Sequence, residues 1–214
     1  KYEVYAWFPS MFGDNLSYAP LHIVQVDIEQ DVINVAWTAP SATLGLSPNS
    51  YASGSVDWTV SPSNGLSVTS SDDATFTFIP TNSVPGEYTV RATSAIVAGA
   101  YDETTVNVVK LEVIPASATN HVFATHRTEF SLSTDSWTNV AWTITPDLPD
   151  GAQLFVDANG GVGASSLSVQ TVHVSSGIVT NTYTLTVTGT DVDGLEAEAS
   201  LEIIAPCLLG PDLK

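Results

Sequence analysis

The sequence has very few basic residues and a single cysteine. Its 214 residues include 5 Lys and Arg against 23 Asp and Glu, which gives a net charge of −18. Nucleic acids and anionic membrane surfaces bind proteins through clustered Lys and Arg, so the charge balance argues against both classes of partner. The one cysteine, Cys207, cannot form an intrachain disulfide.

Long apolar runs and helical periodicity are also missing. No stretch approaches the roughly 18 apolar residues of a membrane-spanning helix, so membrane insertion is not expected. No window repeats its apolar residues at helical spacing over three turns. The chain opens on Lys1 without a signal peptide, which we interpret as a processed protein or a piece of a longer one. A hydrophobic fraction of 43% is still ample for a packed core.

Nearly every remaining segment is typical of a β-strand. Short runs of alternating apolar and polar residues are separated by turns rich in Gly, Pro, Asn and Asp, and the chain holds 49 Ser and Thr. The alternation predicts one buried and one solvated face for each strand, as in two antiparallel sheets packed face to face. The residues expected to face inward are Phe76, Phe78, Tyr88, Val90, Ala92, Val106 and Val108, and then Tyr183, Leu185, Val187, Leu195, Ala197, Ala199, Leu201 and Ile203.

An internal repeat divides these strands into two similar units. Residues 56–62 (VDWTVSP) match residues 140–146 (VAWTITP), and residues 87–93 (EYTVRAT) match residues 182–188 (TYTLTVT). The Trp-to-Trp offset is 84 and the Tyr-to-Tyr offset is 95, so the second unit carries about eleven more residues between its two motifs. Residues 35–40 (VAWTAP) are a third echo, either a neighbouring strand or a relic of the repeat.

The repeated Trp and Tyr predict a particular kind of sandwich. A buried Trp on a middle strand, with a Tyr near the start of a later strand, is the core arrangement of an immunoglobulin-like domain. The predicted core signature is therefore Trp58 with Tyr88 in the first unit, and Trp142 with Tyr183 in the second.

Two segments also resemble known surface modules. Residues 85–93 (PGEYTVRAT) resemble the penultimate strand of bacterial Ig-like repeats. Residues 182–194, which end in DVDG, are similar to the matching stretch of bacterial modules of the polycystic-kidney-disease and cadherin-like types. Such modules recur in adhesins, surface layers, filaments and enzyme accessory regions, so the resemblance implies a fold more than a function.

We therefore predict an all-β protein of two tandem immunoglobulin-like β-sandwich domains, at residues 21–110 and 111–205, followed by a C-terminal tail at 206–214. Residues 106–113 contain no Gly or Pro, so the last strand of the first domain should pass directly into the second. A junction without a flexible linker restricts relative motion.

Residues 1–20 fit neither repeat and predict an additional N-terminal strand segment. The run KYEVYAWF alternates like a strand but carries aromatic residues on both parities, which makes it hard to leave half exposed. It is interpreted as an extra strand of its own domain, as a strand that completes a neighbour's sheet, or as a fragment of a preceding module. The second interpretation assigns self-assembly to Tyr2, Val4, Tyr5, Trp7 and Phe8.

One acidic turn is a candidate metal site. Asp191 and Asp193 lie two residues apart, as in loops that bind hard cations, and the resembling modules hold Ca²⁺ at domain ends. The alternative is a hydrogen-bonded Asp turn. The sequence thus predicts no cofactor, with calcium as the open alternative, and the acids of residues 71–73 and 147–150 are weaker candidates.

The other polar residues of the sequence form no pattern that indicates a catalytic site. Glu196, Glu198 and Glu202 share an outward strand face, which is typical of a solvated or guarded edge. His121 and His126 lack the third and fourth ligands that zinc needs. We therefore do not expect an enzyme. Exposed aromatic residues would be needed to bind a glycan, and the candidates are Tyr5, Trp7, Trp37 and Trp137.

The predicted function is that of a non-catalytic structural module in an extracellular or cell-surface assembly, such as a filament, a surface layer or an adhesin stalk. Its expected partners are further copies of itself or a neighbouring surface protein. The alternatives are a carbohydrate-binding or accessory module of a larger secreted protein, and a virion surface protein.

Overall fold

A computed structural model describes residues 4–8, 17–21, 24–50, 56–97, 99–122, 127–133, 135–148, 150, 152–156, 166–171 and 180–205. Tyr2, His126, Cys207 and the predicted tail lie outside these residues. Within them the chain is all-β, apart from one 3₁₀ turn, η1 (Pro80–Asn82), as the sequence predicted. The chain divides into two compact units, each described here by itself.

The two units differ slightly from the predicted domains. Unit 1 comprises Lys1–Ile33 and Ala39–Val108, and unit 2 comprises Asn34–Thr38 and Val109–Lys214. The division therefore falls two residues before the expected boundary at 110/111. It also gives to unit 2 a five-residue stretch from the first repeat, which the sequence placed wholly in the first domain.

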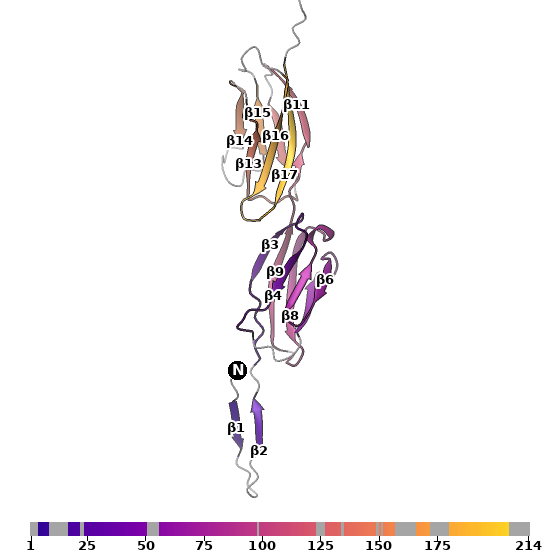
Figure 1. The fold of residues 1–214 in the computed structure, drawn as a ribbon, viewed down its shortest axis with the longest axis vertical. Coiled ribbons are helices and arrows are strands. Elements are labelled where there is room, and N and C mark those ends of the chain that lie inside the picture. Colours follow the sequence, from indigo (N-terminus) through magenta and orange to yellow (C-terminus); the bar gives the residue numbers. More distant parts are fainter. Residues whose placement is uncertain are drawn as a thin grey trace, which may run out of the picture. The chain divides into compact units, whose positions relative to one another are not determined.

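The strands of the first sandwich form a four-stranded and a three-stranded sheet (Figure 1), and they lie in unit 1 apart from the ends of β3 and β9. The first sheet has the order β3-β9-β8-β5, with strands Val32–Ala36, Tyr101–Val109, Gly86–Ser94 and Val56–Ser61. The second has the order β4-β7-β6, with strands Ala42–Gly45, Thr75–Phe78 and Val68–Ser71. The echo motif at residues 35–40 therefore begins in β3, which belongs to the same sheet as β5 but lies at its opposite edge.

Unit 2 contains two four-stranded sheets (Figure 1). One has the order β10-β12-β15-β14, with strands Val113–Ile114, Thr128–Leu132, Ser166–Gln170 and Gln153–Val156. The other has the order β11-β17-β16-β13, with strands Ser117–His121, Glu196–Ile204, Asn181–Gly189 and Val140–Thr145. Lettered in chain order these are sheets A-B-E-D and A′-G-F-C, which is the immunoglobulin arrangement. The predicted fold class is confirmed.

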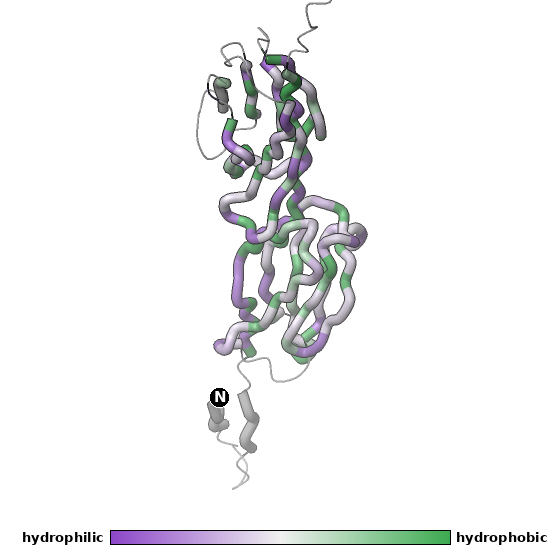
Figure 2. Tube along the Cα trace, turned by 45° about the horizontal axis from the view of Figure 1, so that its top comes forward, coloured by the Kyte–Doolittle hydropathy of each residue, from purple (hydrophilic) through white to green (hydrophobic). Residues whose placement is uncertain are grey.

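Each unit has an apolar core made by the inward residues of its strands. Of the fifteen residues expected to face inward, all but Ala197 are buried, and Ala197 is half-buried against the core of unit 2. Figure 2 shows hydrophobic and hydrophilic positions alternating along the strands, as the period of two requires. The largest buried side chains include Phe76 and Phe78 in unit 1 and Phe130 in unit 2.

The tyrosines and the tryptophans of the core signature differ in how deeply they are buried. Tyr88 and Tyr183 are buried, and the Tyr88 hydroxyl donates a 2.6 Å hydrogen bond to the Val84 carbonyl, the tyrosine corner of immunoglobulin-like domains. Trp58 and Trp142 are only half-buried, contrary to the expectation of a buried Trp on a middle strand. The reason is topological, because β5 and β13 are edge strands of their sheets.

The N-terminal segment is a hairpin rather than one additional strand. β1 (Val4–Phe8) pairs antiparallel with β2 (Ser17–Leu21), and among the described strands this two-stranded sheet joins neither sandwich. The predicted boundary at residue 20 therefore falls inside β2. The second strand escaped prediction because Ser17–Leu21 contains a proline and no charged or polar alternation.

Candidate functional site

The last strand of unit 1 is followed directly by residues whose backbone groups are hydrogen-bonded within unit 2. β9 ends at Val109, and the Lys110 carbonyl already accepts a 3.0 Å bond from the Trp137 N–H. Two residues on, the Ser133 N–H donates to the Glu112 carbonyl at 2.9 Å. The junction predicted from residues 106–113 is thus tied down by backbone bonds within unit 2.

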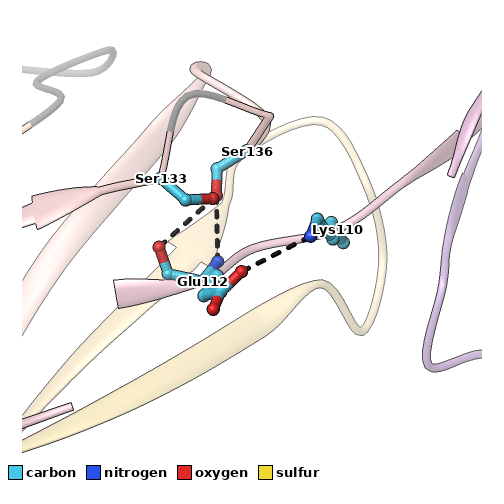
Figure 3. Close-up of polar contacts among 4 residues, drawn as sticks. All are labelled: Lys110, Glu112, Ser133 and Ser136. Carbon is cyan, nitrogen blue, oxygen red and sulfur yellow. Dashed lines mark hydrogen bonds and ion pairs between the residues drawn. The ribbon is translucent and has the colours of Figure 1, made fainter. Parts of the chain in front are cut away.

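Four side chains complete this arrangement, which we call the polar clasp: Lys110, Glu112, Ser133 and Ser136 (Figure 3). The buried Ser136 hydroxyl accepts a 3.0 Å bond from the Glu112 N–H and lies 2.8 Å from the Ser133 hydroxyl. Lys110 Nζ lies 3.4 Å from Glu112 Oε2. The polar clasp could not be predicted from the sequence, because its two serines lie more than twenty residues from the segment that they contact.

Ser136→Ala should lower the free energy of unfolding of unit 2 by about 1 kcal/mol, because it removes the buried acceptor of the Glu112 N–H. Urea unfolding, followed by the fluorescence of the tryptophans, measures this change. Ser133→Ala is the matched control, because the Ser133 hydroxyl contacts the Ser136 hydroxyl and not the N–H of Glu112, and it should cost less than half as much. Equal costs for the two variants would contradict the assignment.

The predicted metal turn is held by its neighbours in unit 2. The Trp137 indole N–H donates a 2.7 Å bond to Asp191 Oδ1, and the Thr190 N–H donates to the Asn139 carbonyl at 3.0 Å. Val192 and Leu195 are buried, and Gly194 has a φ of +70°, a left-handed conformation that favours glycine. Asp191 therefore has a structural partner that the sequence did not reveal.

Asp193 lies exposed in the same turn. Across the residues that the structure describes, no three His, Cys, Asp or Glu side chains gather as a metal centre would require. Calcium takes six to eight oxygen ligands, so Asp191 and Asp193 would need carbonyl and water oxygens in addition. Calcium at this turn stays a prediction.

A second acidic turn is explained by hydrogen bonds alone. Asp72, between β6 and β7, accepts bonds from the N–H groups of Ala74 (2.9 Å) and Thr75 (2.7 Å) and from the Thr75 hydroxyl (3.0 Å). These donors favour the charged carboxylate and hold the pKa of Asp72 below its ordinary value. Asp72 thus acts as a turn cap.

The lowered pKa of Asp72 predicts a pH dependence of unit 1. Because the folded-state pKa lies below the unfolded one, the stabilisation is present above the unfolded pKa and is lost as the pH falls through the folded pKa. An NMR titration of the Asp72 carboxyl carbon should find a midpoint below that of an ordinary aspartate. Thr75→Ala should raise this midpoint by removing one donor. A midpoint at or above the ordinary value would contradict the capping role.

The glutamates of β17 lie on the wet face of their sheet. Glu196 and Glu198 are exposed and Glu202 is half-buried, opposite Thr188, Thr186 and Thr182 of β16 respectively. This face combines threonines with like-charged carboxylates, which is the pattern of a solvated sheet surface.

The remaining predicted residues do not come together. His121 lies in β11, while His126 lies outside the described residues. Trp37 is 39% exposed, whereas Trp137 is half-buried and bonded to Asp191. Val4, Tyr5, Trp7 and Phe8 form most of β1, and nothing is described of their side chains.

One polar contact in unit 1 was missed by the sequence analysis. The Arg91 guanidinium pairs with Glu103 at 2.6 Å and lies 4.2 Å from the centre of the Tyr101 ring. All three side chains lie on β8 and β9, where Arg91 is directly opposite Glu103. The cross-strand register brings them together, and that register is not visible in the sequence.

No family model matches the chain, and no curated protein matches it. Among solved structures it is similar to an I-band fragment of titin (15% identity over 86% of this chain and 66% of that one, TM-score 0.40). It is also similar to domains 4 and 5 of the S-layer protein SbsC (17% identity, 85% and 98%, TM-score 0.30) and to N-cadherin EC1-4 from Drosophila (8%, 86% and 50%, TM-score 0.31).

Because these similarities are so distant, the fold is assigned from the strand order of the two units. No helix within the described part of the chain is long and apolar enough to cross a membrane.

Proposed function

We propose that the chain is a non-catalytic structural module of an extracellular or cell-surface assembly, as a filament, surface-layer or stalk component. One observation carries the proposal. Each unit is a complete immunoglobulin-like sandwich with its own core, and the connection between them is bonded into unit 2 from Lys110 onward. Two sandwiches joined in this way are suited to bear mechanical load and to hold neighbouring parts of an assembly at a set distance.

The surface chemistry fits the same role. Acidic residues outnumber basic ones by 23 to 5, and Arg91 and Lys110 are both engaged in ion pairs. A strongly acidic surface keeps the chain soluble and repels unmatched contacts, so association needs a dedicated uncharged surface. The Thr-rich and Glu-rich outer face of the β16–β17 pair is suited to an aqueous exterior.

Electron microscopy of native or purified material, with a parallel sample in EDTA, tests the proposal. Ordered fibres or sheets are the expected result. Loss of order in EDTA that Asp191→Asn with Asp193→Asn reproduces would assign calcium to that turn. Isolated particles at high protein concentration, with and without calcium, would overturn the assembly-forming role.

A carbohydrate-binding module is the second candidate, favoured by the exposed Trp37. An indole of this kind supplies a stacking surface for a sugar ring. A glycan array provides the test, with Trp37→Ala as the control variant. Binding that disappears in this variant would support the second candidate, and an array without hits would remove it.

A further inference from the structure

The N-terminal hairpin has the composition of a surface that needs a partner. Nine of the ten residues in β1 and β2 are apolar or aromatic and none is charged, on a chain of net charge −18. A two-stranded hairpin is at best marginally stable in water and needs a further strand or a packing partner. Among the described strands, none of either sandwich pairs with it.

The position of Pro20 indicates which outer edge of the hairpin can pair with a further strand. In an antiparallel pair, opposite residues alternate between pairs that exchange both N–H···O=C bonds and pairs that exchange none. Tyr5 lies opposite Pro20, and proline has no N–H to give, so this pair is of the second kind. The bonds within the hairpin therefore run through the pairs Val4–Leu21, Ala6–Ala19 and Phe8–Ser17.

The two outer edges are consequently unequal. The backbone N–H and C=O groups of Tyr5 and Trp7 point away from β2 and form an unbroken outer edge on β1. On the outer edge of β2, Tyr18 offers an N–H group but Pro20 does not. A strand can therefore add to β1, whereas the edge of β2 is blocked.

We propose that this strand is the β1 of a second copy, so that two chains form a four-stranded antiparallel sheet in the order β2-β1-β1′-β2′. The inference deepens the proposed function, on whose subunit contacts it rests. Two copies of an acidic chain repel each other, and pairing through the hairpin brings no like charges of its strands into the contact. Edge β6 of unit 1, by contrast, carries a register irregularity between Val68 and Ser70, a usual protection against strand addition.

Symmetry restricts the geometry of such a pairing. Two identical antiparallel strands meet about a two-fold axis, and residue i contacts residue j in both directions. The register that uses the outward groups of both Tyr5 and Trp7 places Tyr5 opposite Trp7 of the second copy, where the two exchange hydrogen bonds. Ala6, whose own backbone groups bond to Ala19, lies on the axis opposite its counterpart, in a pair without hydrogen bonds. The Cα atoms of such a pair are about 4.5 Å apart, within the range that a disulfide spans.

Cysteine cross-linking tests the register directly. In a Cys207→Ser background, Ala6→Cys should form a disulfide-linked dimer under mild oxidation. Ala19→Cys is the matched control, because it lies opposite Ala6 on the shielded strand and would be about 14 Å from its counterpart across three strand spacings. Equal cross-linking of the two variants, or none by Ala6→Cys, would overturn the proposal.

Sedimentation velocity tests the open edge without cysteines. Trp7→Pro removes an outward N–H from β1, and Tyr18→Pro removes one from β2 at the directly opposite position. Both variants lose one aromatic residue and keep the bonds within the hairpin. Trp7→Pro should raise the dissociation constant of the dimer at least tenfold, because half of the intermolecular backbone bonds are lost. Tyr18→Pro should leave it nearly unchanged, and the opposite order would contradict the proposal.

These tests separate the pairing from the proposed function. A two-fold contact closes on itself, so a filament or layer needs a second contact elsewhere. Cross-linked dimers without ordered assemblies in the microscope would sustain the pairing and overturn the assembly role. Ordered assemblies that persist in Trp7→Pro would sustain the assembly role and overturn the pairing.

Discussion

Phe130→Ala should lower the free energy of unfolding of unit 2 by about 3–5 kcal/mol. Phe130 lies at the centre of β12, has no exposed surface and belongs to the core cluster that also contains Leu167, Leu185 and Leu201. Its removal leaves a cavity that the surrounding β-strands cannot close, because both sheets hold their positions by ladder hydrogen bonds. Urea unfolding of the whole chain, analysed as two transitions, measures the effect.

The matched control for Phe130 lies in unit 1. Leu44 occupies β4, the corresponding strand of the first sandwich, and also has no exposed surface. Leu44→Ala should move the transition of unit 1 by about 2–5 kcal/mol and leave that of unit 2 in place. If either variant shifted both transitions equally, the two cores would not be independent, and a change below about 1 kcal/mol would contradict the burial of Phe130.

Gly65→Ala should destabilise unit 1 by about 2–4 kcal/mol. Gly65 has a φ of +113°, and a Cβ atom at this position would lie 2.5 Å from the Tyr88 hydroxyl oxygen. The hydroxyl cannot move away freely, because it donates to the Val84 carbonyl, and the Val84 N–H in turn donates to the Gly65 carbonyl at 2.7 Å. Thermal unfolding monitored by circular dichroism measures the loss.

A double-mutant cycle isolates the contact between Gly65 and Tyr88. Tyr88→Phe alone should cost about 1 kcal/mol through the lost hydrogen bond. In the Tyr88→Phe background, Gly65→Ala should cost clearly less than in the native chain, because the clashing oxygen is gone. Gly99→Ala, where a Cβ meets nothing within 4 Å, should be nearly neutral. Strictly additive costs would contradict the tight approach.

The sequence predicted the layers of the fold because β-strand alternation is a local property. A period of two in residues such as Val90, Ala92, Leu185 and Val187 identifies the buried face before any pairing is known. The internal repeat added the number of units, since a matching Trp and Tyr motif marks corresponding strands in each. Most of the additional residues of the second unit lie between β14 and β15, where the connection comprises residues 157–165. The corresponding connection of the first unit, between β6 and β7, comprises only residues 72–74.

The burial of the tryptophans could not be predicted in the same way. Trp58 and Trp142 share the inward parity of their strands, but whether a strand is central or at an edge depends on which others pair with it. At the edge, the indole of Trp58 is half-buried and donates to the Asp72 carbonyl at 2.9 Å. The hairpin partner of β1 was hidden for a related reason, because Ser17–Leu21 has no alternation to mark it as a strand.

By itself, then, the sequence determined the all-β class, the two sandwiches and their inward residues, because each follows from local pattern and composition. Only the tertiary structure decided the partners of individual polar groups. Asp191 bonds to Trp137 from 54 residues away, and the Glu112 N–H bonds to Ser136 from 24 residues away. Such contacts depend on how loops meet at the end of a sandwich, and long-range strand pairing sets that geometry.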